Sequence, residues 1–291
     1  MIYFCQQLLN ALQLGSLYAL IALGYTMVYG ILTMINFAHG DFFMIGAFVC
    51  FLLVTFFQLP FVPILLLSML GVSLLGVTVE RIAYRPLRQA PRLSAIITAL
   101  GVGIFLENLT LAISPYPKYV PEVLPNIIWN IYGVTFSLLQ SLTIGLAIIL
   151  MLILNYIVQN TSIGIAMRAV SWDKNIVPLM GVSVNRIISI TFALGSALGG
   201  AAGVMYALAY PMIDPYMGVM VGWKAFIGAV IGGIGDIRGA MLGGIILGAV
   251  EIFSTSILPS SYRDFVSFSL LLLLLLVRPQ GIFGRARSEK L

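Results

Sequence analysis

The chain has 291 residues, of which 60% are hydrophobic and only 9% are charged, and its formal net charge is +5. A soluble domain carries roughly 25% charged residues, so this composition excludes a water-soluble globular protein and makes the bilayer the solvent for most of the surface. The basic residues stand beside hydrophobic runs, which indicates membrane orientation rather than nucleic-acid binding.

Long apolar runs predict an all-α fold, a polytopic transmembrane helical bundle that forms one integral membrane domain over 1–291. A spanning helix needs about 20 mostly apolar residues. The seventh expected span is glycine-rich, so eight crossings are the alternative to nine. In chain order the expected spans are 8–30, 42–59, 62–79, 93–113, 137–157, 187–210, 217–234, 239–258 and 264–277.

Basic residues in the loops orient the bundle. With nine crossings and the N-terminus outside, only Lys118, Lys224 and Arg263 fall outside. The other basic residues fall inside, which predicts a cytoplasmic C-terminus: Arg81, Arg85, Arg88, Arg92, Arg168, Lys174, Arg186, Arg238, Arg278, Arg285, Arg287 and Lys290.

The loop between the fourth and fifth spans, 114–133, holds four prolines together with Tyr116, Tyr119, Trp129 and Tyr132. Proline stiffens the loop and the aromatic residues suit the membrane interface. The loop either docks an extracytoplasmic partner or is an ordinary interfacial loop.

An internal repeat links the two halves of the chain. Residues 34–48 align without gaps to 212–226, with identities at Met34/Met212, Ile35/Ile213, Gly40/Gly218, Ala47/Ala225 and Phe48/Phe226. The first copy follows a span that runs inward, and the second follows one that runs outward. This pattern predicts an inverted-topology repeat with halves of about 8–157 and 187–277, and a substrate path at their interface. Chance similarity between two apolar segments is the alternative.

Polar residues near the repeat are candidates for the substrate path. The cluster at 36–41 and its aligned counterpart at 214–218 favour a broken helix, whose free N–H groups suit a substrate carboxylate. Glu107 and Glu251 lie inside expected spans, where each either bonds a neighbouring helix or lines a cavity. His39 is the only histidine, which argues against a metal site. The candidate path residues are Asn36, Phe37, His39, Gly40, Asp41, Glu107, Asp214, Gly218 and Glu251.

Glycines recur through 232–244, GGIGDIRGAMLGG. Such spacing lets helix backbones approach closely in lipid. A glycine-rich cytoplasmic turn explains the segment without a ligand, and a hinge or broken helix is the other interpretation. The candidate hinge and packing residues are Gly232, Gly233, Gly235, Asp236, Gly239 and Gly243.

The sequence contains no G-x-x-x-x-G-K-[ST] phosphate loop, no G-x-S-x-G nucleophile elbow and no His/Cys cluster. We therefore expect a transport subunit rather than an enzyme. If transport is driven by a nucleotide, the energy must come from another chain.

Residues 159–186, QNTSIGIAMRAVSWDKNIVPLMGVSVNR, interrupt the apolar sequence, and we call them the polar segment. The pattern predicts a short helix and turn over 168–181, ended by Pro178 and Gly181. Trp172, Ile176 and Val177 would then fill a groove in a partner. A solvated amphipathic loop at the lipid headgroups is the alternative.

Five stretches together resemble the permease subunits of bacterial ABC importers for branched-chain amino acids, specifically the H-type (LivH-like) subunit. They follow the expected order over nearly the whole chain: LGSLYALIALGYTMVYGILTMINFAHGD, ERIAYRPLR, GIAMRAVSWDKNIVPLMGVSVNRII, KAFIGAVIGGIGDIRGAMLGG and LLLLLLLVRPQGIFGR. Related permeases carry urea, short amides or other amino acids with similar motifs, so these substrates stay as alternatives.

The resemblance implies a multi-pass protein of the bacterial cytoplasmic (inner) membrane and a set of partners. These are a second homologous permease subunit, two cytoplasmic ATPase subunits that hold ATP and Mg, and a periplasmic substrate-binding protein. The chain itself would hold no cofactor and no nucleic acid. The residues implied in ATPase coupling are Gly164, Arg168, Ala169, Asp173, Lys174 and Gly181.

Two other classes of function stay open at the level of sequence. An ion-coupled secondary transporter would need an acidic relay inside the membrane and no ATPase partner. A non-transporting membrane scaffold would need neither.

Overall fold

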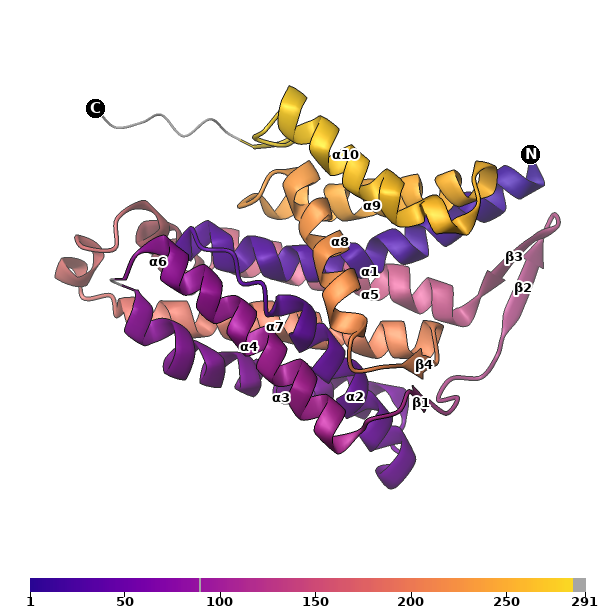
Figure 1. Cartoon of the computed structure of the whole chain (residues 1–291), viewed down its shortest axis with the longest axis horizontal. Helices are drawn as coiled ribbons and strands as arrows, with labels where there is room; N and C mark the ends of the chain where they lie inside the picture. The colour runs from indigo at the N-terminus through magenta and orange to yellow at the C-terminus, as the bar shows by residue number, and fades with distance from the viewer. Residues whose placement is uncertain (89, 285–291) are drawn as a thin grey trace.

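The computed structural model describes residues 1–88 and 90–284, which form a bundle of helices lying side by side (Figure 1). Eight helices of the described part are long and apolar enough to cross a membrane, which confirms the predicted class. They are α1 (Ile2–Leu32), α2 (His39–Phe57), α3 (Phe61–Val79), α4 (Arg92–Ile113), α5 (Leu138–Asn160), α7 (Val184–Ala209), α9 (Ile237–Ile257) and α10 (Arg263–Val277). The helical turns η1 (Glu80–Tyr84) and η2 (Arg85–Leu87) extend α3, and η4 (Ser260–Tyr262) precedes α10.

The helices end at two opposite faces of the bundle (Figure 1). One face carries the short helix α6 (Ser162–Trp172) and the turn η3 (Val177–Met180), and the other carries the N-terminus and all the described strands. Basic side chains of the polar segment lie at the α6 face, so this face is cytoplasmic. The same rule that orients the sequence thus predicts that the N-terminus is outside. Arg285, Arg287 and Lys290, which support the same orientation, lie outside the described residues.

The outer loop contains strands that the sequence pattern did not reveal. Strands β2 (Ile128–Ile131) and β3 (Val134–Ser137) form an antiparallel hairpin, and β1 (Lys118–Tyr119) pairs with β4 (Met212–Ile213). Tyr132 and Gly133 form the hairpin turn with φ values of 52° and 85°, which matches the twist of paired strands. The hairpin is an ordered structure that extends the bundle at its outer face.

Helices α1 and α7 form the centre of the bundle. In their most apolar stretches 89% and 72% of the residues are buried, against 6% for the peripheral α10. Helix α1 packs along α9, and α7 packs along α3 in the corresponding way. If α1 is equivalent to α7 and α3 to α9, each of these contacts joins the first helix of one half to the third helix of the other half. An inverted-topology repeat has this arrangement.

Helices α2 and α8 (Met217–Gly232) are equivalent in the two copies of the repeat, and both begin inside the bundle. The gapless alignment of 34–48 with 212–226 pairs His39 with Met217, and these are the first residues of the two helices. The aligned glycines Gly40 and Gly218 touch each other, because a Cβ at Gly218 would lie 2.7 Å from the carbonyl oxygen of Gly40. Two equivalent positions can meet in this way only at the axis that relates the repeats.

Helix α8 has 16 residues and is too short to span the membrane by itself. It is preceded at the outer face by β4, which pairs with β1. It ends at Gly232, where the next residues line a cytoplasmic cavity together with Arg168 of α6. Strand β4, the turn at 214–216 and α8 therefore complete a ninth crossing of the described chain, rather than a re-entrant loop.

Candidate functional site

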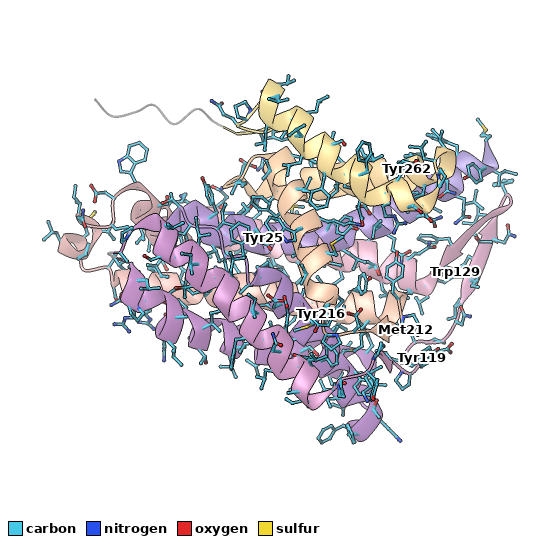
Figure 2. The ribbon with its side chains drawn as sticks, viewed as in Figure 1. Tyr25, Tyr119, Trp129, Met212, Tyr216 and Tyr262 are labelled. Carbon is cyan, nitrogen blue, oxygen red and sulfur yellow. The ribbon has the colours of Figure 1, made fainter. Side chains whose placement is uncertain are left out.

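An axial cavity of about 240 Å³ lies where α2 and α8 begin, between α1 and α4. Tyr25 of α1, which lines it, lies midway along the bundle, and Tyr216 directly precedes α8 (Figure 2). The cavity is therefore deep in the membrane and next to the contact between Gly40 and Gly218. Its lining residues are Tyr25, Phe37, Asp41, Leu100, Gly103, Ile104, Glu107, Gly218, Val219, Gly222 and Trp223.

Two carboxyl groups lie together in this axial cavity. Asp41 is only 4% exposed, and its Oδ1 atom has no hydrogen-bond partner. Glu107, in the C-terminal half of α4 and partly exposed, lies close enough to Asp41 for the two carboxyls to interact. A buried carboxyl oxygen without a partner is costly in a medium of low dielectric constant and marks a functional position in membrane proteins.

The structure brings only some of the candidate path residues together. Phe37, Asp41, Glu107 and Gly218 line the axial cavity, and Gly40 lies against Gly218. The remaining candidates do not line this cavity, so fewer residues line it than the sequence analysis proposed for the substrate path.

Asn36 and His39 lie behind the cavity wall. Asn36 Oδ1 accepts a hydrogen bond of 2.5 Å from the hydroxyl of Tyr84. His39 is buried and packs edge-to-face on Tyr25, with ring centroids 4.9 Å apart. Asp214 accepts a hydrogen bond from the backbone N–H of Tyr216 at 2.9 Å, and so shapes the turn before α8.

Glu251 lies in a separate cluster of charged residues, which we call the ionic cluster. It is fully buried and accepts hydrogen bonds from Tyr18 at 2.9 Å and Ser267 at 2.8 Å. Lys224 of α8 bridges Glu251 at 3.0 Å and Asp264 at 2.8 Å. Of the two interpretations left open by the sequence, Glu251 thus fits the bonding of neighbouring helices and does not line the axial cavity.

Several residues of interest were missed in the sequence. Tyr25, Trp223 and the small residues of the axial cavity lie in continuous apolar runs, where nothing distinguishes a lining side chain from a packed one. Glu80 was missed because the third span was expected to end at Val79, whereas the helix continues to Leu87. Glu80 is buried, forms an ion pair with Arg88 and accepts a hydrogen bond from Ser189 at 2.6 Å.

The polar segment folds against the end of α5. Thr161 caps α6 by accepting a hydrogen bond from Gly164 N at 3.2 Å, and Gly164 has no room for a side chain because α5 carbonyls adjoin it. Arg168 donates to the carbonyl of Val158 at the end of α5, where a cation is favourable. Lys174 donates to the carbonyl of Leu32 at 3.1 Å and so joins the segment to α1.

The local structure of the polar segment corrects two expectations. The helix begins at Ser162 and ends at Trp172, whereas the sequence pattern predicts a short helix and turn over 168–181. Pro178 lies within η3 instead of ending a helix, and Gly181 ends η3 with φ 78°.

The surface of the polar segment gives a third correction. Val177 is 4% exposed, so it packs inside the subunit and cannot fill a groove in a partner. Trp172 and Ile176 are 78% and 56% exposed, as a contact surface requires. Ala169 accepts the backbone N–H of Asp173, whose carboxylate accepts from Asn175 N at 2.8 Å to close the following turn.

A cytoplasmic cavity of about 680 Å³ connects the polar segment to the glycine-rich turn between α8 and α9. Arg168, Gly233, Gly235 and Asp236 all line it. Asp236 caps α9 by accepting a hydrogen bond from Gly239 N at 2.7 Å. Gly232, Gly239 and Gly243 bring α8 and α9 into backbone contact, so packing and a tight turn both account for these glycines.

We expect Gly235→Ala to lower stability by about 1–3 kcal/mol, because Gly235 has φ 104° and a side chain strains that backbone conformation. A Cβ at Gly235 would lie 3.9 Å from its nearest neighbouring atom, so it would not be crowded. The loss of stability would therefore report backbone strain alone. Thermal inactivation of the purified protein measures it. Gly71→Ala, in a helix with open space around it, is the control and should not reduce stability.

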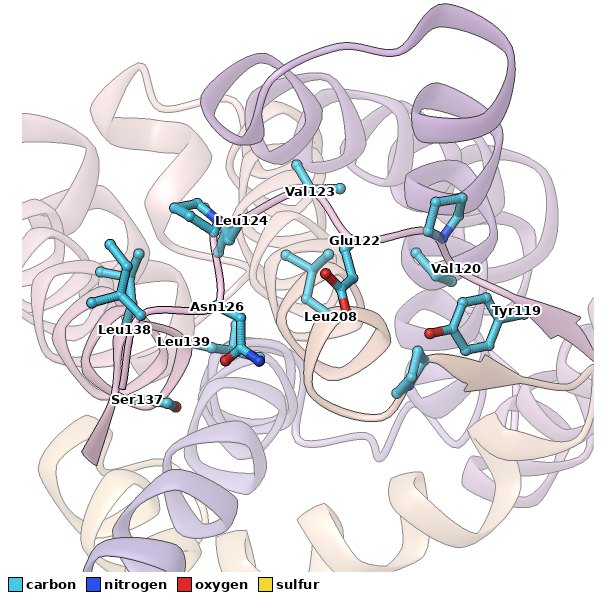
Figure 3. Close-up of a pocket in the computed structure, with 14 residues that line it drawn as sticks. Tyr119, Val120, Glu122, Val123, Leu124, Asn126, Ser137, Leu138, Leu139 and Leu208 are labelled. Atoms are coloured by element: carbon cyan, nitrogen blue, oxygen red, sulfur yellow. The ribbon is translucent and has the colours of Figure 1, made fainter. Parts of the chain in front are cut away.

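An outer cavity of about 220 Å³ lies between the loop at 119–127 and the start of α5 (Figure 3). Tyr119, Val120, Glu122 and Leu138 are among its lining residues, and Leu208 lines it from the end of α7. Gln6 of α1 anchors the neighbouring hairpin, because it donates to Thr135 O at 3.0 Å.

The described residues contain no group of three or more His, Cys, Asp or Glu side chains that could hold a metal ion. The axial cavity supplies two carboxyl groups with aromatic and aliphatic walls. That combination suits a small, partly apolar ligand more than a metal ion, which prefers several oxygen or nitrogen ligands.

The nine-crossing bundle with its inverted repeat and axial cavity defines a multi-pass permease of the bacterial cytoplasmic (inner) membrane. A family model described as "Branched-chain amino acid transport system / permease component" matches residues 7–275, and the chain belongs to this family.

Relatives resemble it over nearly their whole length. The high-affinity branched-chain amino acid transport system permease protein LivH of Escherichia coli (strain K12) is 40% identical, over 99% of this chain and 98% of the relative. The permease protein BraD of the corresponding system in Pseudomonas aeruginosa is 42% identical with the same coverage. PsaBC from Streptococcus pneumoniae in complex with a Fab aligns over 93% of this chain and 91% of that chain at 15% identity and a TM-score of 0.48, a likeness too low to carry an argument.

Proposed function

We propose that the chain is one of two homologous permease subunits of an ABC importer, and that branched-chain amino acids cross the membrane along its axial cavity. The observation that carries this proposal is the meeting of α2 and α8 at Gly40 and Gly218, beside a cavity with two carboxyl groups. Transport proteins built from inverted repeats bind their substrates near the midplane at such an interface. The names of the LivH and BraD relatives support the substrate class.

In this proposal the energy comes from two cytoplasmic ATPase subunits that hold ATP and Mg. They would contact α6 and η3, where Trp172, Ile176, Leu179 and Met180 are all more than half exposed at the cytoplasmic face. The cytoplasmic cavity then gives a physical route for coupling. It places Arg168 of α6 beside the turn that ends α8, and α8 begins at the axial cavity.

A periplasmic binding protein would deliver the substrate to the outer face. The hairpin and the outer cavity support this part of the proposal, because they present Tyr119, Trp129 and Tyr132 to the outside with large exposed fractions. Aromatic side chains of this kind are enriched at protein interfaces.

Uptake by the reconstituted importer tests the substrate. Proteoliposomes with both permease subunits, the ATPase pair and the binding protein should accumulate labelled leucine when ATP is supplied, and should not accumulate urea. Accumulation of urea or of a short amide without leucine would show that the substrate is not a branched-chain amino acid. No uptake at all would contradict a permease function.

The paired carboxyls of Asp41 and Glu107 also favour a second candidate, an ion-coupled secondary transporter. Purification from the native membrane separates the two. An ATPase pair that accompanies the chain supports the importer, and leucine uptake by the chain alone, driven by a proton gradient, supports the second candidate.

Arg168→Glu should uncouple ATP hydrolysis from uptake and leave membrane insertion intact. The substitution reverses the charge on α6 and places a carboxylate against the carbonyl end of α5, where Arg168 now donates to Val158. We expect uptake to fall at least about tenfold at unchanged ATPase content. Arg168→Lys keeps the charge and is the control, and unchanged leucine uptake by Arg168→Glu would refute the coupling role.

A further inference from the structure

The axial cavity contains negative groups and no positive ones. Asp41 and Glu107 both line it, and the described lining includes no Lys, Arg or His side chain. The nearest basic residue on α8, Lys224, is held by Glu251 and Asp264 in the ionic cluster. The buried carboxyl of Asp41, beside the partly exposed carboxyl of Glu107 and without a counterion in the described lining, needs either a proton or a cationic ligand.

The unpartnered oxygen of Asp41 identifies where that cation would lie. Oδ1 is buried, has no hydrogen-bond partner and belongs to a residue that lines the cavity. A Cβ at Gly218 would lie 2.9 Å from this oxygen, so it is turned toward the meeting point of α2 and α8. A donor group at this oxygen would satisfy Asp41, whose other oxygen lies toward Gly103 of α4, the helix that carries Glu107.

The rest of the cavity selects among cations. Phe37 and Trp223 contact each other with ring centroids 5.2 Å apart, and Leu100 and Ile104 are aliphatic. Aromatic faces attract ammonium groups, and apolar walls exclude a hydrated metal ion. The volume of about 240 Å³ suits a small molecule. The combination fits a primary ammonium group that carries a short apolar side chain.

We propose that Asp41 and Glu107 bind the α-ammonium group of an amino acid substrate, while Phe37, Ile104 and Trp223 contact its apolar side chain. This inference rests on the function proposed above and adds the groups that recognise the substrate. It explains how the permease itself distinguishes amino acids from urea and amides, because those neutral molecules have no charge to offer the two carboxyls.

The repeat gives an internal comparison. The alignment of the two copies pairs Asp41 with Val219, and both residues line the axial cavity. The negative charge therefore comes from one copy only, although the backbone is repeated. The structure thus supplies one ammonium site at the axis and no equivalent counterpart at the aligned position.

Ligand analogues test the proposal without changing the protein. The complete importer in lipid nanodiscs, without the binding protein, is titrated with 3-methylbutylamine and with 4-methylpentanoate, and Trp fluorescence is recorded. The amine keeps the ammonium group of leucine and the acid keeps only its carboxylate. We expect the amine to bind at least about tenfold more tightly. Equal binding of the two, or no binding of the amine, overturns the proposal.

Isosteric variants give the second measurement. Asp41→Asn, Glu107→Gln and their combination should lower leucine uptake at least about tenfold, while the loaded binding protein still stimulates ATP hydrolysis. Glu107→Asp keeps the charge and should recover part of the uptake. Asn108→Gln, the next residue on α4 and outside the cavity lining, is the matched control. Normal leucine uptake by the double variant overturns the ammonium site but leaves the importer function standing, whereas an inactive wild-type complex contradicts the importer itself.

Discussion

Lys224→Met should destabilise the folded chain by about 3–5 kcal/mol, the largest effect that we expect from a single substitution. Lys224 neutralises the fully buried Glu251 at 3.0 Å, and methionine of similar length fills the space without the charge. Arg263 lies 3.8 Å from Glu251 and only partly replaces it. A purified complex should therefore lose helical structure at a clearly lower temperature, and circular dichroism during heating measures the change.

Two further variants separate the buried charge from the packing of the same side chain. Asp264, whose side chain is 46% exposed, also contacts Lys224, and Asp264→Asn should cost less than about 1 kcal/mol. Combining Lys224→Met with Glu251→Gln should recover much of the loss, because no uncompensated charge is then left inside. A double variant as unstable as Lys224→Met would show that packing and not charge accounts for the effect.

Gly40→Ala should reduce transport at least about tenfold and also destabilise the chain, by about 1–3 kcal/mol. A Cβ at Gly40 would overlap the carbonyl oxygen of Gly218 and lie 2.9 Å from Gly222 Cα. These neighbours are backbone atoms at the start of α8, so they cannot rotate away as a side chain can. The initial rate of leucine uptake and the thermal stability of the same preparation are the measurements.

Gly101→Ala is the matched control, because Gly101 lies on a helix with open space around the added methyl group. It should leave uptake unchanged and raise helix stability by up to about 1 kcal/mol. If Gly40→Ala transported leucine at the wild-type rate, the contact between α2 and α8 would have no part in the substrate path.

The apolar runs were sufficient to predict the bundle, since each spanning helix is a local pattern about 20 residues long. The repeat was also visible, because Gly40 and Gly218 must stay small to let the two half-helices touch. The orientation followed from Arg81, Arg168 and their basic neighbours in the loops.

The partners of each polar residue were not predictable, because they depend on which helices touch. Glu107 and Glu251 looked alike in the sequence, as single acids in apolar runs. Only the packing shows that Glu107 faces Asp41 in a cavity while Glu251 is neutralised by Lys224. The roles assigned to the polar segment, Arg168 and Asp173 among them, stay predictions until coupling is measured.

The outer hairpin was missed for a different reason. Its strands at Ile128–Ile131 and Val134–Ser137 are four residues each, and the prolines before them were interpreted only as stiffening an interfacial loop. The pairing is fixed by the turn at Tyr132 and Gly133 and by the contact of Thr135 with Gln6, which is distant in sequence.

The repeat alignment pairs Gly46 with Lys224, two residues whose backbones are equivalent but whose side chains serve different purposes. At Gly46 the first copy lets α2 approach α7 closely, with a Cβ there only 2.7 Å from Gly200 Cα. At the equivalent place the second copy carries the cation of the ionic cluster. A duplicated chain of this kind has two different physical requirements at one repeat position, so a substitution tolerated in one copy should destabilise the other. The two halves have thus become specialised and are no longer interchangeable, although their helices still follow the same path.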